Sequence, residues 1–128
     1  MTLMAEYCFE LPKGTDKTLI FSLYTKNKDG SKVVFGLNGF GCAMQIRTAY
    51  YSKTAVDSFT TANGKITIDE DKGQISIRFD HESTEKYPTG ALVYDIELTN
   101  SAGEVTRPIS GKIKVTPEVT KIEPTDKL

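Results

Sequence analysis

Residues 91–99 read Ala-Leu-Val-Tyr-Asp-Ile-Glu-Leu-Thr, and this stretch decides the fold class. An apolar residue occupies every second position, and the positions between them carry valine, two acids and threonine. A period of two is typical of a β-strand with one buried face and one wet face, because successive side chains of a strand point to opposite sides. We therefore expect the alternate residues of this strand to lie in the core: Leu92, Tyr94, Ile96 and Leu98.

A second strand is predicted to return beside the first. Residues 100–103, Asn-Ser-Ala-Gly, are typical of a tight turn, and residues 104–116 follow with Ile113 and Val115 on the apolar face. Because proline has no backbone N–H to donate, the region around Pro108 is expected to be a sheet edge or a β-bulge.

Three shorter strands are predicted upstream as an antiparallel meander. They cover residues 58–61, 65–69 and 74–80. Asn63-Gly64 separates the first two, and this dipeptide is the strongest short signal for a hairpin. A second turn is predicted at residues 70–73, where the sequence is Glu-Asp-Lys-Gly.

The first half of the chain continues the β pattern. Cys42, Met44 and Ile46 alternate with more polar residues in a predicted strand over residues 42–51. The only helix expected is a single turn within residues 81–90. Further strands are predicted over residues 5–11, 17–25 and 32–37, and the last two are joined by an Asp-Gly turn within residues 27–31.

Short strands separated by turn residues every ten residues or so favour an all-β fold, an antiparallel two-sheet β-sandwich. A small closed barrel is the alternative architecture. A parallel sheet needs long crossover connections, usually helices, and the sequence supplies none. The sequence predicts one sandwich domain over residues 1–116 and an extended C-terminal tail over residues 117–128.

The composition excludes several classes of partner. The formal net charge of the 128 residues is −1, whereas proteins that bind nucleic acid phosphates or an anionic membrane surface carry a basic excess. No apolar run approaches the ~20 residues of a membrane-spanning helix. The first residues lack the basic and apolar regions of a secretory signal. We therefore expect a chain that folds in a reducing cytoplasm and binds neither nucleic acid nor membrane.

The residues that could ligate a metal are few. Cys8 and Cys42 are expected to be reduced, partly buried thiols, with a disulfide as the alternative if the first strand lies near Cys42. Together with the single histidine, His81, they do not make a four-ligand zinc pattern. We expect His81 to be solvated in a loop, and the acids of residues 69–71 to lie in a solvated turn and not around calcium.

No residues group into a catalytic pattern. Asp95 and Glu97 point outward on one strand, and they are expected to form cross-strand pairs with Lys112 and Lys114. A nucleophile, a base and an orienting group are not recognisable together. The sequence therefore predicts a protein that is not an enzyme and has no cofactor, metal or small-molecule substrate.

Four aromatic residues are candidates for contact with a partner. Phe40 stands between two glycines, Tyr50 and Tyr51 are adjacent so that one must point away from the core, and Tyr87 precedes a proline. Together they could form one exposed patch, and the alternative is that they are separate core or rim residues. If they cluster on one face, a carbohydrate-binding platform gains support.

Two prolines mark further candidate contact regions. Pro108 lies in the predicted edge around residues 107–111, and the first strand, residues 5–11, is the other candidate edge. An edge strand presents unpaired N–H and C=O groups that can join the sheet of a partner. Pro117 begins the predicted tail, which could become ordered on a neighbouring molecule.

Several stretches in order carry a resemblance: residues 41–47 (Gly-Cys-Ala-Met-Gln-Ile-Arg), 61–69 (Thr-Ala-Asn-Gly-Lys-Ile-Thr-Ile-Asp) and 94–99 (Tyr-Asp-Ile-Glu-Leu-Thr), continued by residues 103–107 and 111–120. Their order resembles a family of small virion proteins of tailed bacteriophages. It is similar, more loosely, to the immunoglobulin-like N-terminal domains of phage baseplate upper proteins. The resemblance covers roughly residues 15–120.

The resemblance implies an immunoglobulin-like sandwich that is a structural component of the virion, in the tail, baseplate or neck or as a decoration of the capsid surface. Its implied partners are other virion proteins in a symmetric, multicopy assembly, built in the cytoplasm of the bacterial host. It supplies no catalytic residues. A module that binds carbohydrate or the host surface is the alternative from a different class, since sandwiches host that function too.

Overall fold

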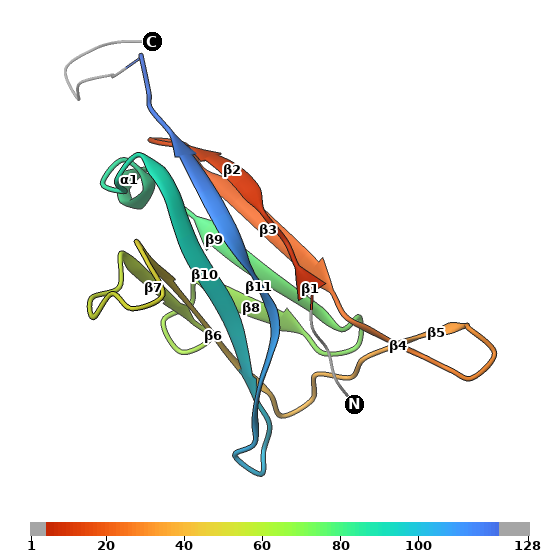
Figure 1. Ribbon diagram of the computed structural model, residues 1–128. Coiled ribbons are helices and arrows are strands. Elements are labelled where there is room, and N and C mark those ends of the chain that lie inside the picture. The colour runs from red at the N-terminus through yellow and green to blue at the C-terminus, as the bar shows by residue number, and fades with distance from the viewer. Residues whose placement is uncertain (1–4, 121–128) are drawn as a thin grey trace.

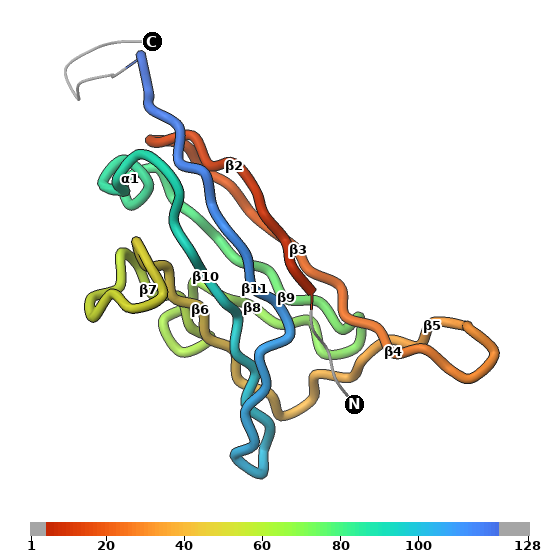
Figure 2. Tube along the Cα trace, in the orientation of Figure 1, coloured from red at the N-terminus to blue at the C-terminus, as the bar shows by residue number. Residues whose placement is uncertain are grey.

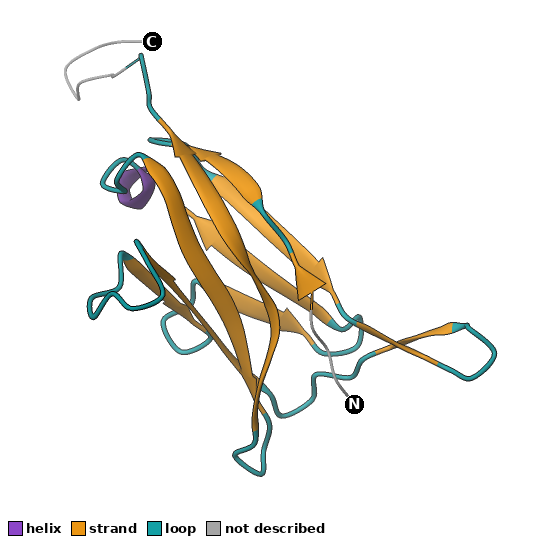
Figure 3. Cartoon of the chain, in the orientation of Figure 1, coloured by secondary structure: helices purple, strands orange, loops and turns teal. Residues whose placement is uncertain are grey.

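The computed structural model describes residues 5–120, which contain eleven strands and one short helix. Strands make up nearly all of the regular structure (Figures 1 and 3). The predicted all-β class is therefore confirmed. The elements are β1 (Ala5–Glu6), β2 (Phe9–Pro12), β3 (Lys17–Ser22), β4 (Tyr24–Lys26), β5 (Lys32–Val34), β6 (Gly41–Arg47), β7 (Asp57–Thr60), β8 (Ile66–Asp69), β9 (Gln74–Phe79), α1 (His81–Thr84), β10 (Gly90–Thr99) and β11 (Val105–Thr116).

The larger sheet has the strand order β1-β11-β10-β6-β7, and β2 also pairs with β11. Antiparallel pairing joins β11 to β10, β10 to β6 and β6 to β7. In contrast, β1 and β2 run parallel to β11, so the prediction of a wholly antiparallel fold is wrong at this edge. The rest of the domain connects these parallel strands, and no crossover helix is needed.

The smaller sheet has the order β3-β9-β8, with antiparallel pairing throughout. The predicted hairpin of β8 and β9 is confirmed, but the rest of the meander is wrong, because β7 pairs with β6 in the larger sheet. The side chain of Asn63 closes the turn between β7 and β8. Its Oδ1 accepts hydrogen bonds from the backbone N–H groups of Thr60 and Lys65, both at 3.0 Å, and closes a turn that carries the chain from one sheet to the other.

Side chains from both sheets make one core. The ring of Phe79 in β9 lies 5.0 Å from that of Phe59 in β7 and 6.0 Å from that of Phe9 in β2, measured between centroids. Aromatic pairs at such separations attract each other beyond the area that they bury. The predicted alternation is confirmed, since the buried residues include Cys42, Met44, Ile46, Leu92, Tyr94, Ile96, Leu98, Ile113 and Val115.

The structure shows how β11 accommodates a proline. The register between β10 and β11 shifts between Ile96 and Leu98, so that two residues of β11, Arg107 and Pro108, lie opposite one residue of β10. The predicted bulge is therefore confirmed. The prediction that residues 107–111 form an open edge is wrong, because the residues after Pro108 pair with β1.

The first strand, predicted as continuous over residues 5–11, is interrupted at Tyr7. The carbonyl oxygen of Tyr7 accepts a hydrogen bond from the hydroxyl of Tyr94 at 2.5 Å, and burial raises the pKa of this hydroxyl, which keeps it protonated. Gly111 lies directly against the interruption, since a Cβ at this position would overlap the carbonyl of Tyr7. The glycine therefore allows the first strand to cross close to β11.

The last strand ends at Thr116, and residues 117–120 form neither helix nor strand. The remaining part of the predicted tail, residues 121–128, lies outside the described residues. Within the described part of the chain, β1 and β2 pair only with β11, so they form an edge of the larger sheet, as predicted.

Candidate interaction surface

A hairpin formed by β4 and β5 extends away from the other strands (Figure 2). We call residues 24–34 the projecting hairpin. Three of its large apolar side chains are exposed, Tyr24 by 43%, Val33 by 45% and Val34 by 42%. An isolated two-stranded hairpin is only marginally stable in water. The exposed apolar groups make this hairpin a candidate surface for contact with another molecule.

The turn of the projecting hairpin follows from its Asp-Gly sequence. Gly30 has a φ of 88°, which few other residues adopt readily. The carboxylate of Asp29 accepts hydrogen bonds from the Ser31 hydroxyl at 2.6 Å and the Ser31 backbone N–H at 2.9 Å. These bonds hold the pKa of Asp29 below its usual range, so the only acid of the hairpin is occupied within its own turn.

One face of the projecting hairpin combines apolar and basic side chains. Tyr24 lies opposite Val34, and Lys26 lies opposite Lys32, two residues further along the same face. The Nζ of Lys32 is 5.6 Å from the centroid of the Tyr24 ring, within range of a cation–π interaction. Two like charges directly across a hairpin repel each other, so this face favours a neighbour that carries negative charge.

The base of the hairpin rests on the turn between β8 and β9. The backbone N–H of Leu23 donates to the carbonyl of Gly73 at 2.9 Å, and the N–H of Phe35 donates to the carbonyl of Leu23 at 3.0 Å. Gly73 has a φ of 62°, and a Cβ added to it would lie 2.8 Å from Cγ1 of Val34. The Val34 side chain therefore points toward Gly73 in this turn.

A second surface feature is a shallow groove of about 300 Å³ across the outer face of the larger sheet. Gln45 and Arg47 of β6, Asp95 and Glu97 of β10, and the exposed ring of Tyr50 are among its lining residues. The guanidinium of Arg47 donates to the carbonyl of Ser52 at 2.9 Å and to Oε1 of Gln45 at 2.6 Å. These bonds fix the polar floor of the groove.

The two acids of this groove pair with Arg107, which was not predicted from the sequence to be their partner. Arg107 lies 2.9 Å from Glu97 and 3.6 Å from Asp95. The predicted pairs with Lys112 and Lys114 are wrong, because these lysines lie opposite Val93 and Ala91. The bulge at Pro108 brings Arg107 beside the two acids.

The four aromatic candidates do not gather on one face. Tyr50 is 76% and Tyr51 90% exposed in the turn after β6. Phe40 is half-buried and packs against Phe35, with ring centroids 5.7 Å apart. Tyr87 is buried, and its hydroxyl donates to a carboxylate oxygen of Asp57 at 2.5 Å. Burial, together with this bond, raises the pKa of Tyr87. Of the two alternatives, the structure therefore favours separate core and rim residues over one exposed patch.

The two proline candidates differ in exposure. Pro108 is buried at the bulge of β11 and offers no open edge to a partner. Pro117 is exposed immediately after the last strand. Of the six predicted contact residues, only Tyr50, Tyr51 and Pro117 are therefore exposed.

Both cysteines are free thiols, as expected, but their surroundings differ. Cys42 is buried in β6, and burial raises the pKa of its thiol to about 12, so it stays protonated and unreactive. Cys8 is exposed between β1 and β2, which corrects the expectation of partial burial. Its Sγ accepts a hydrogen bond from the backbone N–H of Lys112 at 3.4 Å.

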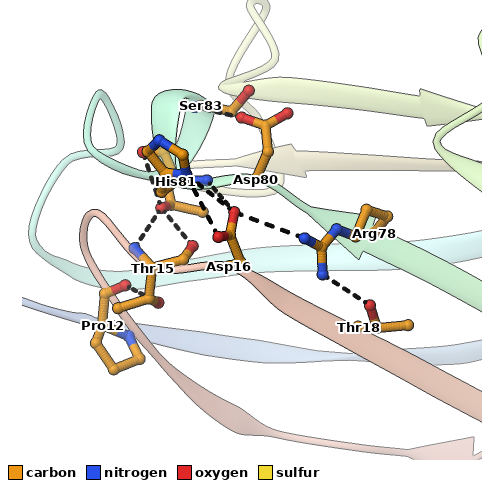
Figure 4. A network of polar contacts seen from close by, with 9 residues as sticks. Pro12, Thr15, Asp16, Thr18, Arg78, Asp80, His81 and Ser83 are labelled. Atoms are coloured by element: carbon orange, nitrogen blue, oxygen red, sulfur yellow. Dashed lines mark hydrogen bonds and ion pairs between the residues drawn. The ribbon is translucent and has the colours of Figure 1, made fainter.

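His81 is exposed, as predicted, but it is not isolated (Figure 4). Its backbone N–H donates to the carboxylate of Asp16 at 2.8 Å, and its ring Nδ1 lies 3.1 Å from the same oxygen. The hydrogen bond from the His81 ring to the Asp16 carboxylate raises the pKa of His81, and the bonds that Asp16 accepts from His81 lower the pKa of Asp16. Arg78 lies 3.8 Å from the same carboxylate. The cluster joins the residue before β3 to the start of α1.

Within residues 5–120, no three histidine, cysteine or acidic side chains are grouped so that they could hold a metal ion. The acidic turn at residues 69–71 is exposed, and the carboxylate of Asp69 accepts a hydrogen bond from the backbone N–H of Lys72 at 3.1 Å. In the same described part of the chain, no helix is long and apolar enough to cross a membrane.

The exposed apolar residues of the projecting hairpin were not predicted from the sequence. The adjacent pair Val33-Val34 was a usable signal, because two neighbouring strand residues point to opposite faces and a single core can cover only one of them. To predict that Tyr24 lies opposite Val34, one must know the register of the two strands, and the Asp-Gly turn at residues 29–30 alone does not determine it.

No protein-family model matches the chain, and no curated protein is similar to it.

Proposed function

We propose that this chain is a non-enzymatic structural component of a tailed-bacteriophage virion, an assembly or adaptor module of the tail, baseplate or neck or a decoration of the capsid surface. Its partners are other virion proteins, and it works in several symmetric copies. The proposal joins the resemblance of residues 41–47, 61–69 and 94–99 to virion proteins with the surface features of the fold.

We further propose that the fold is an immunoglobulin-like two-sheet sandwich. The smaller sheet, β3-β9-β8, and the path β2-β11-β10-β6-β7 of the larger sheet are consistent with the division of strands in such domains, where the last two strands and a middle strand share one sheet. The shared core, with Phe79 against Phe59 and Phe9, supports two facing layers.

The single observation that carries the structural role is the projecting hairpin. It holds Tyr24, Val33 and Val34 partly exposed on one arm outside the core, and apolar groups gathered in this way are found at contact surfaces. Such an arm suits a protein that functions by contacting a neighbouring protein. The lysines on the face that carries Tyr24 and Val34 favour a neighbour with negative charge.

The proposal is tested by locating the protein in purified particles with mass spectrometry and antibody labelling. We expect the wild-type chain in the particle at many copies. We expect Val33→Ser/Val34→Ser protein to fold but to be incorporated poorly. Thr18→Ser/Thr67→Ser, which changes exposed strand residues of the smaller sheet, is the matched control. Absence of the wild-type chain from particles would contradict the proposal.

A second candidate function is binding of a carbohydrate in the groove of the larger sheet. Tyr50 offers a ring for stacking beside the hydrogen-bonding side chains of Gln45, Asp95 and Arg107, and sugar sites combine these two elements. Screening against an array of bacterial surface glycans tests it. Binding that Tyr50→Ala abolishes and Tyr24→Ala preserves would favour this function, and failure to bind any glycan would remove it.

A further inference from the structure

We infer that β3 is a further contact surface, and that its free edge pairs with β3 of a second copy of the same chain. The two strands run antiparallel about a two-fold axis at Ile20, so that the smaller sheets of the two copies join into one. This contact is separate from the projecting hairpin, and it goes beyond the proposed function.

The backbone of β3 has one paired side and one unpaired side. The N–H of Arg78 in β9 donates to the carbonyl of Lys65, next to β8, at 3.0 Å. Because successive N–H groups of a strand point in opposite directions, the odd-numbered residues of β9 face β3, and they pair with the odd-numbered residues of β3. The N–H and C=O groups of residues 18, 20 and 22 therefore point away from β9. In the described part of the chain, β3 pairs with no other strand.

Other edges of the fold are protected against pairing with another chain. At β7, the N–H of Ser58 donates to the side chain of Asp57 at 2.8 Å, and the N–H of Thr60 donates to the side chain of Asn63 at 3.0 Å. The edge at β2 ends on Pro12, which has no N–H, and β8 is only four residues long. In contrast, β3 is six residues long, has a regular register and contains no proline. Long regular edges of this kind are those that accept another strand.

The free edge of β3 is complementary to itself. An axis at Ile20 places residue 18 of each copy opposite residue 22 of the other, so that every outward N–H meets an outward C=O. Ile20 is 60% exposed in the single chain. In the dimer, the two Ile20 side chains lie directly opposite each other, with their Cβ atoms about 4.5–5.5 Å apart. Each copy therefore covers the exposed isoleucine of the other.

The inner face of the same edge is also apolar. Phe21 is partly buried, and the ring of Tyr7 packs edge-on against it, with 5.5 Å between the centroids. Tyr7 is itself 45% exposed. In the proposed register, Phe21 lies opposite Leu19 of the second copy, so both faces of the joined strands gain an apolar neighbour.

The register opposes no like charges within residues 17–23. Lys17 is the only charged residue of this segment, and it lies opposite Leu23 of the second copy. The guanidinium of Arg78 donates to the hydroxyl of Thr18 at 3.1 Å, and Thr18 lies opposite the uncharged Ser22. The strands therefore pair without the repulsion that opposed like charges cause.

The first test is sedimentation velocity on the purified full chain at concentrations up to about 1 mM, where a small interface becomes populated. We expect the wild type to dimerise. We expect Ile20→Lys to raise the dissociation constant at least about tenfold, because it places two like charges directly across the axis.

Thr67→Lys is the matched control, since Thr67 and Ile20 both lie opposite Ser76 and the new charge is two strands away from the edge. Thr18→Ser keeps the backbone and a hydroxyl, so it should dimerise like the wild type. Circular dichroism confirms that each variant folds.

Cross-linking tests the position of the axis. Each variant also carries Cys8→Ser, which removes the exposed native thiol, and Cys42 is buried. Ile20→Cys places two thiols across the axis, where paired Cα atoms are about 5.5 Å apart, a separation that a disulfide spans. Ser22→Cys places them about 14 Å apart along the strands. We expect mild oxidation to link the first variant into a dimer and to leave the second unlinked.

Hydrogen exchange followed by NMR reports the pairing of the backbone itself. The amides of residues 18, 20 and 22 should exchange quickly in dilute protein and become protected as the concentration rises. A wild type that is monomeric at all concentrations, a dimer that Ile20→Lys does not weaken, or equal cross-linking at the two positions overturns the inference. Particle incorporation is measured separately, so a chain that is monomeric in solution and still enters particles would leave the proposed function standing.

Discussion

At the scale of single residues, Thr84 is the buried polar group that ties α1 to the start of β3. Its hydroxyl donates to the carbonyl of Thr15 at 2.9 Å and accepts from the Thr15 N–H at 3.1 Å, and the residue is fully buried. Thr84→Val keeps the shape and leaves both Thr15 groups without this partner. We expect a loss of about 1–3 kcal/mol in the free energy of unfolding, measured in urea.

Thr89→Val provides the comparison for Thr84, since it is the same change at an exposed position five residues later in the same loop. We expect it to alter the free energy of unfolding by less than about 0.5 kcal/mol. Equal effects of the two substitutions would show that the Thr84 hydroxyl does not stabilise the loop.

The pair of His81 and Asp16 gives a prediction about pH. The hydrogen bond with Asp16 raises the pKa of His81, so the stabilisation by this pair is lost as the pH rises through the pKa of the folded state. The lowered pKa of Asp16 means that the stabilisation is also lost in strong acid, as that carboxyl becomes protonated. The pair therefore stabilises the fold most in mildly acidic solution.

We expect Asp16→Asn to lower the pKa of His81 toward the ordinary value for histidine. His81 is the only histidine of the chain, so its ring protons can be followed by NMR through a pH titration without overlap. Asp71→Asn removes an exposed acid that makes no ion pair within residues 5–120, and it should leave the His81 titration unchanged. An unchanged midpoint in Asp16→Asn would contradict the assignment of the raised pKa to this contact.

At the scale of elements, the seat of the projecting hairpin on Gly73 gives a third prediction. Ala at Gly73 would have to adopt a φ of 62° and would place its Cβ 2.6 Å from the carbonyl oxygen of Phe35. Gly64 has a φ of 81° and open space around it. Gly64→Ala should therefore lower the free energy of unfolding by about 1–2 kcal/mol, through the backbone conformation alone. We expect Gly73→Ala to lower the free energy of unfolding by more than Gly64→Ala does, and hydrogen exchange at Phe35 to become faster. Equal losses would contradict the close contact.

Predictions that depend on local pattern succeeded at this scale. The alternation of Leu92, Tyr94, Ile96 and Leu98 marked the buried face of β10, because the pleat of a strand fixes which residues share a side. The Asp-Gly sequence also correctly predicted the turn of the projecting hairpin, because glycine readily adopts the positive φ that Gly30 has there.

Predictions that depend on which strands pair failed. The Asn63-Gly64 turn looks like a hairpin in the sequence, yet β7 pairs with β6, because the choice of neighbour depends on burying residues such as Phe59 against the other sheet. The partner of Asp95 and Glu97 was missed because the bulge at Pro108 changes the register between β10 and β11. The exposed side chains of the hairpin were missed because burial is a property of the whole fold.

At the scale of the whole molecule, the C-terminal segment gives a fourth prediction. Deletion of residues 117–128 should leave the domain folded, because the last strand ends at Thr116. We expect the midpoint of thermal unfolding to stay within a few degrees of that of the full chain. The same deletion should weaken assembly, since the sequence predicts that this segment docks on a neighbouring molecule. Normal incorporation of the truncated protein into particles would show that the segment makes no such contact.

The central claim is that this fold presents its projecting hairpin as a contact arm inside a virion. Electron cryomicroscopy of purified particles tests it most directly. The account predicts density for several symmetric copies of the domain, with Tyr24, Val33 and Val34 buried against a neighbouring subunit. Particles that lack the chain, or that hold it with these side chains free in solvent, would contradict the account.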